Sequence, residues 1–101
     1  MKMLLTVEFP PEPFNTLVRS GKVGEIIGRI LETIKPETAY FTEQDGKRGG
    51  IFVVDVKTPS DVPVLAEPFF LKFQAECRFR ILMSPEDLQK GGLEELGKKW
   101  A

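Results

Sequence analysis

Apolar and polar residues alternate at the start of the chain, as they do in a strand with one buried side. Between residues 3 and 9 one side of this segment is apolar, with Met3, Leu5, Val7 and Phe9. Similar runs predict three more strands, over residues 38–44, 50–56 and 77–83. The dipeptide Asp45-Gly46 is typical of a two-residue hairpin turn, so we expect the second and third strands to form a hairpin.

Apolar residues recur at spacings of three and four between the first two strands, which predicts an amphipathic helix over residues 22–35. The stripe consists of Val23, Ile26, Ile27, Ile30, Leu31 and Ile34. A shorter helical turn is expected over residues 14–19. Gly24 and Gly28 lie four residues apart in the main helix, and we expect them to let it pack closely on the sheet.

Two further helices are predicted in the second half. Thr58-Pro59-Ser60-Asp61 is typical of a helix start, but Pro63 and Pro68 follow, so we expect this helix to be bent or divided. Ser84-Pro85 opens a last helix, which Gly91-Gly92 breaks before an apolar stripe. That stripe consists of Leu93, Leu96 and Trp100.

The predicted order of elements is β-α-β-β-α-β with a helical end, which is the split βαβ or ferredoxin-like arrangement of the α+β class. We expect one domain over residues 1–101, with a helical extension over about 84–101. Its four antiparallel strands should lie in the order 4-1-3-2, with both helices on one face. The other face of the sheet is then open.

The register of the hairpin decides which side chains lie on that open face. A two-residue turn at Asp45-Gly46 pairs Gln44 with Lys47, so the numbers of paired residues in this hairpin sum to 91. A bulge at Gly49-Gly50 would shift this pairing by one residue. One row across the open face should then read Tyr40, Ile51, Glu8 and Arg78. The helix-covered face should hold Phe41, Phe52, Val54, Val7, Phe9, Phe79 and Ile81. The open face should hold Leu4, Thr6, Glu8, Thr38, Tyr40, Thr42, Ile51, Val53, Asp55, Arg78, Arg80 and Leu82.

This mainly apolar open face needs a partner, most simply a second copy of the chain. The composition also limits which other partners, such as nucleic acids or membranes, are expected. With 14 Lys+Arg, 15 Asp+Glu and a net charge of -1 among 101 residues, the chain is not a pervasively basic nucleic-acid binder. No apolar run approaches the roughly 20 residues that span a bilayer. We therefore expect a homodimer without a nucleic-acid or membrane partner.

The chain contains no histidine and one cysteine, Cys77. This excludes Ser-His-Asp and Cys-His catalysis, histidine or multi-cysteine zinc sites and internal disulfides. We expect no metal or other cofactor. A single cysteine fits the reducing cytoplasm, where we expect the protein to act. Cys77 alternates with Phe79 and Ile81, which indicates an unreactive thiol in the core.

Several short segments point to a known group. They are Tyr40-Phe41, Asp45-Gly46-Lys47-Arg48, Pro59-Ser60, Ala66-Glu67-Pro68-Phe69-Phe70 and Glu86-Asp87-Leu88. With the predicted order of elements and the open face, nearly the whole chain resembles the dimeric α+β barrel superfamily, which includes muconolactone isomerase-like proteins and small monooxygenase-like domains. The segments themselves are similar to an uncharacterised bacterial group with this fold. The resemblance implies a homodimer and no particular reaction.

Six residues are candidates for a ligand site. Tyr40, Glu8, Arg78 and Arg80 share the open face, where arginine would hold a carboxylate and tyrosine would donate a hydrogen bond. The alternative is a cross-strand ion pair between Glu8 and one of the arginines. Arg48 either belongs to a charged hairpin tip or anion-binding turn, or reaches Glu67 beside Pro68 to form a buried pair.

These features favour a homodimer that binds a small anionic or aromatic metabolite, or that has a purely structural role. One alternative is a cofactor-free isomerase- or monooxygenase-like enzyme, which would use Tyr40 with Glu8 or Glu67. The remaining alternative is an RNA-binding module. Residues 48–53 partly resemble an RNA-recognition core sequence, but two of its aromatic positions are Gly50 and Asp55.

Overall fold

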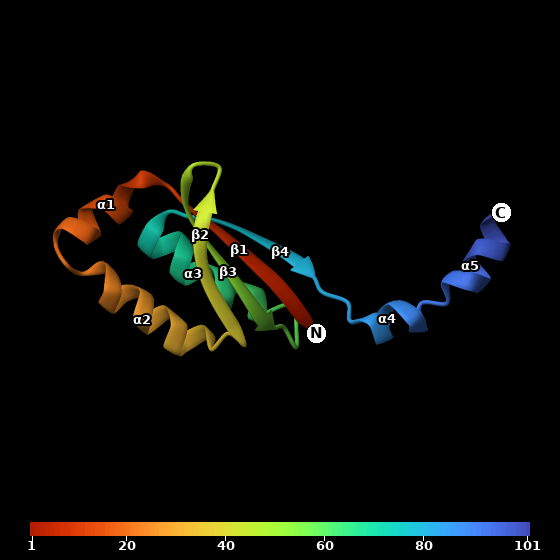
Figure 1. Ribbon diagram of the computed structural model, residues 1–101. Helices are drawn as coiled ribbons and strands as arrows, with labels where there is room; N and C mark the ends of the chain where they lie inside the picture. The colour runs from red at the N-terminus through yellow and green to blue at the C-terminus, as the bar shows by residue number, and fades with distance from the viewer.

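The computed structural model describes residues 1–101 and has one antiparallel four-stranded sheet (Figure 1). Its strands are β1 (Lys2–Phe9), β2 (Thr38–Gln44), β3 (Lys47–Asp55) and β4 (Glu76–Ile81). They lie in the order β2-β3-β1-β4, which reads 4-1-3-2 from the other edge. The fourth strand ends at Ile81, two residues before its predicted end. The protein therefore has an α+β fold with β2 and β4 as its edge strands.

Three helices connect the strands. Helices α1 (Pro11–Arg19) and α2 (Val23–Ile34) join β1 to β2, and α3 (Asp61–Phe73) joins β3 to β4. Helix α3 was expected to be bent or divided; it is one continuous helix, so division was the wrong alternative. Pro63 lies in the first turn, where a missing N–H costs no helical hydrogen bond, and Pro68 is accommodated inside the helix.

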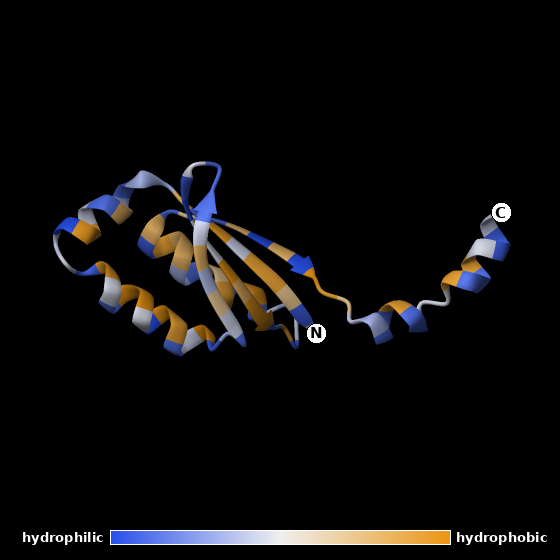
Figure 2. Cartoon of the chain, viewed as in Figure 1, coloured by the Kyte–Doolittle hydropathy of each residue, from blue (hydrophilic) through white to orange (hydrophobic).

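The core lies between one face of the sheet and these three helices. Leu5, Val7, Phe9, Phe52 and Val54 are at most 1% exposed, as the predicted alternation of the strands requires. Figure 2 shows the apolar residues concentrated on β1, β3 and α3 and recurring along α2. The covered face of the two central strands is thus set by their alternating pattern.

An aromatic cluster fills the middle of this core. The centre of the Phe9 ring lies 5.2 Å from the ring centre of Phe14, 6.1 Å from that of Phe69 and 5.1 Å from that of Phe73. Each of the three is an edge-to-face pair. Phe14 and Phe73 are also 5.1 Å apart. These contacts connect β1 to α1 and α3, so one strand residue fixes the position of two helices.

The edge strands are less well covered than expected. Phe41 on β2 and Ile81 on β4 have the predicted parity, but they are 52% and 59% exposed. The helices lie over the central strands and leave the edges partly uncovered. Phe41 still packs its ring edge-to-face on the buried Phe52, at 5.8 Å.

The glycines of α2 do not contact the sheet, so the prediction that they allow close packing was wrong. An added Cβ at Gly28 would meet no heavy atom within 4 Å. At Gly50 on β3 it would lie 2.7 Å from the ring of Phe52, which is fully buried. The close approach in this fold therefore belongs to β3 and not to α2.

Opposite effects on stability are expected from two alanine substitutions. Gly28→Ala should stabilise the protein by about 0.5–1 kcal/mol, because glycine is a poor residue for an exposed helix position. Gly50→Ala should destabilise it by about 1–3 kcal/mol, because the added methyl overpacks the Phe52 ring. Urea unfolding of both variants at one protein concentration measures the difference. Equal effects would contradict this view of the core.

The chain after β4 leaves the globular part of the molecule. We call residues 83–101 the C-terminal arm; it contains α4 (Pro85–Lys90) and α5 (Leu93–Trp100). Figure 1 shows it extending away from the sheet. The radius of gyration is 17.2 Å, against about 13 Å for a compact domain of 100 residues, and the longest dimension is 60 Å. The predicted helical extension is present, but no other part of the chain covers it.

The arm lacks a core of its own. Neither α4 nor α5 has a buried residue, although Leu88, Leu93, Leu96 and Trp100 are large and apolar. A capping box between Ser84 and Asp87 starts α4, with both side-chain-to-backbone bonds present. Helices of six and eight residues are only marginally stable in water without packing. The arm therefore needs another apolar surface.

Candidate functional site

The open sheet face has the composition that the hairpin register predicts. Tyr40 pairs with Ile51 and Thr38 with Val53, each pair summing to 91, and there is no bulge at Gly49-Gly50. Leu4 pairs with Val53 on one side and Arg80 on the other. One row of this face therefore reads Thr38, Val53, Leu4 and Arg80, with apolar residues in the middle and an arginine of β4 at its end.

One row differs from its prediction. It reads Tyr40, Ile51, Thr6 and Arg78, because Thr6 and not Glu8 lies between Ile51 and Arg78. Glu8 belongs to the next row, opposite Gly49 and Glu76. The predicted row was wrong by one pair because the offset between β1 and its neighbours is set by packing and not by a short turn.

Glu8 forms the centre of a charged cluster at one end of the open face. Its side chain is 11% exposed, and its carboxylate oxygens lie 3.2 Å from the Lys47 ammonium and 3.7 Å from the Arg78 guanidinium. Arg78 also contacts Glu76, at 3.4 Å. The structure thus has the ion pair between Glu8 and Arg78 that was the alternative to an anion pocket.

Tyr40 and Arg80 lie apart from this cluster. Tyr40 is on the edge strand β2, two strands from Glu8, so at least about 10 Å of sheet separates them. Arg80 is exposed on the opposite edge and forms no ion pair within the chain. Within one chain the four predicted residues of the open face do not form a common pocket.

Arg48 does not reach Glu67, so the predicted buried pair is wrong. Its guanidinium donates a hydrogen bond to the side-chain oxygen of Asn15, at 2.7 Å, and lies 4.3 Å from the centre of the Phe14 ring. Glu67 is exposed on α3 and forms no ion pair. The sequence offered no spacing that links residue 15 to residue 48, because α1 brings Asn15 to β3 through tertiary packing.

Arg48 lines a small apolar cavity of about 250 Å³ on the helix-covered side of the sheet. It lies between the ends of β1, β2 and β3 and helices α1 and α2. Its lining consists of Phe9, Phe14, Ile27, Phe41, Thr42, Arg48 and Gly49. A more polar hollow of about 490 Å³ shares Phe9, Thr42 and Arg48 with it and adds Asn15 and Lys47. Arg48 thus lines both the apolar cavity and the more polar hollow.

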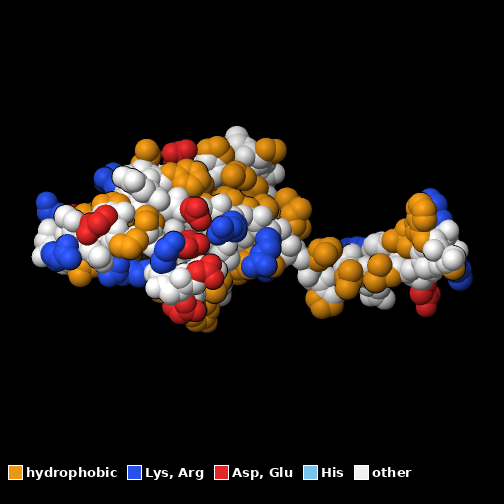
Figure 3. Space-filling view, turned by 90° about the horizontal axis from the view of Figure 1, so that it is seen from above, with side chains coloured by type: hydrophobic (Ala, Val, Ile, Leu, Met, Phe, Trp, Pro, Cys, Tyr) orange, Lys and Arg blue, Asp and Glu red, His pale blue; other side chains and the backbone are white.

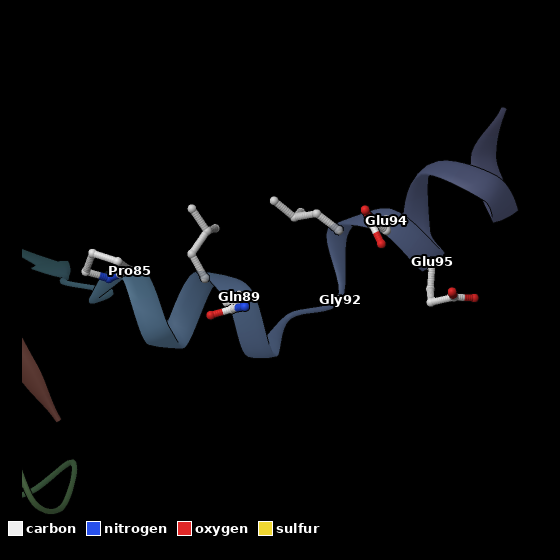
Figure 4. A pocket seen from close by; sticks show the side chains of 7 residues that line it. Pro85, Gln89, Gly92, Glu94 and Glu95 are labelled. Atoms are coloured by element: carbon white, nitrogen blue, oxygen red, sulfur yellow. The ribbon is translucent and has the colours of Figure 1, made fainter.

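A hollow of about 670 Å³ lies in the bend of the arm (Figure 4). Pro85 and Gln89 line it from α4, Gly92 lies at the bend, and Glu94 and Glu95 follow on α5. The labelled side chains do not converge on one point. This hollow exists because two short helices meet at an angle, and it has no group of side chains that suits a ligand.

Cys77 is a poorly reactive thiol. It is half-buried on the covered side of β4, and burial, with the nearby Glu67 carboxylate, raises its pKa from 9.0 to about 11. Both effects disfavour the thiolate, which is the reactive form. The position agrees with the predicted packing role.

We expect iodoacetamide to modify native Cys77 at pH 8 about 100-fold more slowly than the urea-unfolded chain, because the pKa difference of two units lowers the thiolate fraction by that factor. The native rate should rise about tenfold per pH unit up to pH 10. Mass spectrometry of quenched samples gives both rates. Equal rates in the native and unfolded chain would contradict the burial of this thiol.

The structure brings no three acidic or cysteine side chains together in a group that would hold a metal ion. None of its helices combines the length and apolar character required to cross a membrane. Phe52 is fully buried, so Tyr40 is the single aromatic residue on the open face for the stacking of bases. Tyr40 also has neither Glu8 nor Glu67 beside it, which leaves the enzymatic alternative without an assembled pair.

Comparisons with known proteins do not assign the chain to a group. No protein-family model matches the sequence, and no curated protein is significantly similar to it. The function therefore has to be argued from the open face, the arm and the cavity beside Arg48.

Proposed function

We propose that this protein binds a small molecule and assembles as a homodimer, with the open sheet faces of two ferredoxin-like chains stacked into an α+β barrel. The main observation that supports the homodimer is the open face itself. Leu4, Ile51 and Val53 form its apolar centre, and no helix of the same chain lies over them. An apolar face of this kind is stabilised by exclusion of water.

The arm supports a second copy as the partner. Each chain offers one uncovered apolar face and one arm with exposed Leu88, Leu93, Leu96 and Trp100. Figure 3 shows the arm standing clear of the globular part, with hydrophobic side chains along it. A two-fold dimer in which each arm packs on the other chain satisfies both surfaces at once, and one kind of chain is sufficient.

Charge favours the same arrangement. Asp55 is paired with the amino terminus and Glu8 with Lys47 and Arg78, whereas Arg80 has no ion partner. On the arm, Glu86 and Glu94 are also without a cation. The arm's four acidic residues and three lysines leave it nearly neutral, but Glu86 and Glu94 can still pair with the arginine edge of the open face on contact.

The size of the face bears on how much contact area a dimer would have. Four strands about 4.8 Å apart, each with about seven residues at about 3.3 Å, cover a projected area of roughly 450 Å². A standard interface buries about 800 Å² of accessible surface per partner, a measure that follows the relief of the side chains and so exceeds the projected area of the same face. We infer that the arm adds contact area to that of the face.

The mass of the protein in solution tests this assembly. Light scattering after size exclusion should give twice the chain mass of 11.4 kDa at micromolar concentration. A single-chain mass would overturn the proposal. Larger, undefined assemblies would also contradict it, because a two-fold interface closes after two copies.

A further inference from the structure

The guanidinium of Arg48 is held in place without being neutralised. Its contacts are the Asn15 oxygen at 2.7 Å and the face of the Phe14 ring at 4.3 Å, and both come from α1. No carboxylate of the chain lies within ion-pair distance of it. Glu43, its partner across the hairpin, accepts a hydrogen bond from the Gly46 backbone at 2.8 Å instead. Arg48 is a fixed cation with unused donors.

The cavity next to this cation is apolar. Phe9, Phe14, Ile27 and Phe41 supply most of its wall, and Phe41 is half exposed at the edge of the sheet. Its volume of about 250 Å³ exceeds the roughly 150 Å³ of a cavity that binds one benzene molecule. One substituted aromatic ring therefore fits. The more polar hollow that shares Arg48 is lined by Lys47, Asn15 and also Glu43, whose carboxylate is engaged by the Gly46 backbone.

We propose that this cavity, the Arg48 pocket, binds a small aromatic carboxylate. The ring lies among Phe14, Ile27 and Phe41, where apolar area is removed from water and aromatic edges pack on the ring. The carboxylate accepts hydrogen bonds from the donors of Arg48 that Asn15 leaves free, and a two-pronged contact of this kind is among the stronger polar contacts in proteins. Because Asn15 and Phe14 already hold the guanidinium, little of its conformational freedom is lost on binding.

This inference names the ligand class for the small-molecule binding that we propose above. All residues of the Arg48 pocket belong to one chain, and its apolar wall of Phe9, Phe14, Ile27 and Phe41 lies on the helix-covered side of the sheet, while Thr42 and Gly49 line it at the strand ends. The pocket contains none of Leu4, Ile51 and Val53, the apolar centre of the open face, so we infer that it does not need the dimer. An experiment can therefore disprove ligand binding without disproving the dimer, and the reverse.

Three probes separate the contributions of ring and charge. Benzoate has both, benzamide has the same ring without the charge, and acetate has the charge without the ring. In titrations followed by amide chemical shifts, benzoate should bind saturably, with the largest shifts at residues that line the pocket, such as Gly49 and Thr42. Benzamide and acetate should each bind at least about tenfold more weakly, since each lacks one contribution worth about 1.4 kcal/mol or more. Equal binding of all three would overturn the proposal.

Variants test the role of the guanidinium. Arg48→Gln keeps a polar side chain but removes the charge and should weaken benzoate at least about tenfold. The control is Arg29→Gln, an exposed arginine on α2 outside the pocket, which should leave affinity within twofold. Arg48→Lys keeps the charge without the planar fork and should fall between the two. If Arg48→Gln were unfolded by circular dichroism, Arg48→Lys and the ligand series would still decide. Equal affinity of the Arg48 and Arg29 variants would disprove the site.

A monomeric variant distinguishes this proposal from the proposed assembly. Val53→Lys changes the open face and no residue of the Arg48 pocket. Benzoate affinity should stay within twofold in this variant. A loss of affinity together with the dimer would show that the pocket depends on the second chain, contrary to the inference. A monomeric native protein that still binds benzoate would refute the assembly alone.

Discussion

Val53→Lys is expected to keep the protein monomeric at concentrations where we propose that the unchanged chain forms a dimer. Val53 lies in the apolar centre of the open face, beside Leu4 and Thr38. In a two-fold interface each dimer would contain two added ammonium groups, both removed from water in an apolar layer. We expect the dissociation constant to rise at least about 100-fold, or about 2.8 kcal/mol. Analytical ultracentrifugation over a range of concentrations measures the change.

The matched control is Val64→Lys. Val64 is also a valine and lies on α3, away from the open face; it is exposed in the single chain, whereas Val53 is partly buried there. The same substitution there should leave the dimer unchanged. If both variants dissociated, general destabilisation would be the cause. If neither did, the open face would not be the interface, and the arm alone or another surface would hold the copies together.

The sequence predicted the central part of the fold because local patterns control it. Alternation in β1 placed Leu5, Val7 and Phe9 in the core, and the turn at Asp45-Gly46 fixed the pairing of β2 with β3. A two-residue turn leaves one register, so the composition of the open face followed from counting residues. The β1 offset could not be counted in this way, and the row containing Glu8 was wrong by one pair for that reason.

The candidate site was harder to predict because tertiary packing decides it. Arg48 and Glu8 are both in strands, but their partners are set by elements far away in the sequence. Asn15 reaches Arg48 from α1, and Lys47 reaches Glu8 from the hairpin. Arg48 has no ion partner and contacts the proline-rich start of α1 only in the folded chain. Neither feature produces a periodic pattern in the sequence. Sequence patterns could identify these charged residues but could not tell which of them lie free beside an apolar cavity.

Phe73→Ala is expected to have the largest effect on stability. The Phe73 side chain is fully buried, and its ring lies 5.1 Å from both Phe9 and Phe14. Its removal leaves a cavity at the point where β1, α1 and α3 meet, which should cost about 3–5 kcal/mol. For a domain of this size that corresponds to a fall in the melting temperature of roughly 12–40 °C. Thermal and urea unfolding at fixed protein concentration measure it.

Phe70→Ala is the control for this prediction. Phe70 is on the same helix and receives the same substitution, but it is 40% exposed and has no close aromatic partner. Its loss should cost about 1 kcal/mol or less, since less apolar area is returned to water. A similar cost for both variants would mean that α3 is held by another surface and not by the aromatic cluster. Because Phe73 positions α1 through Phe14, its loss should also displace Asn15 and weaken the Arg48 pocket, whereas Phe70→Ala should not.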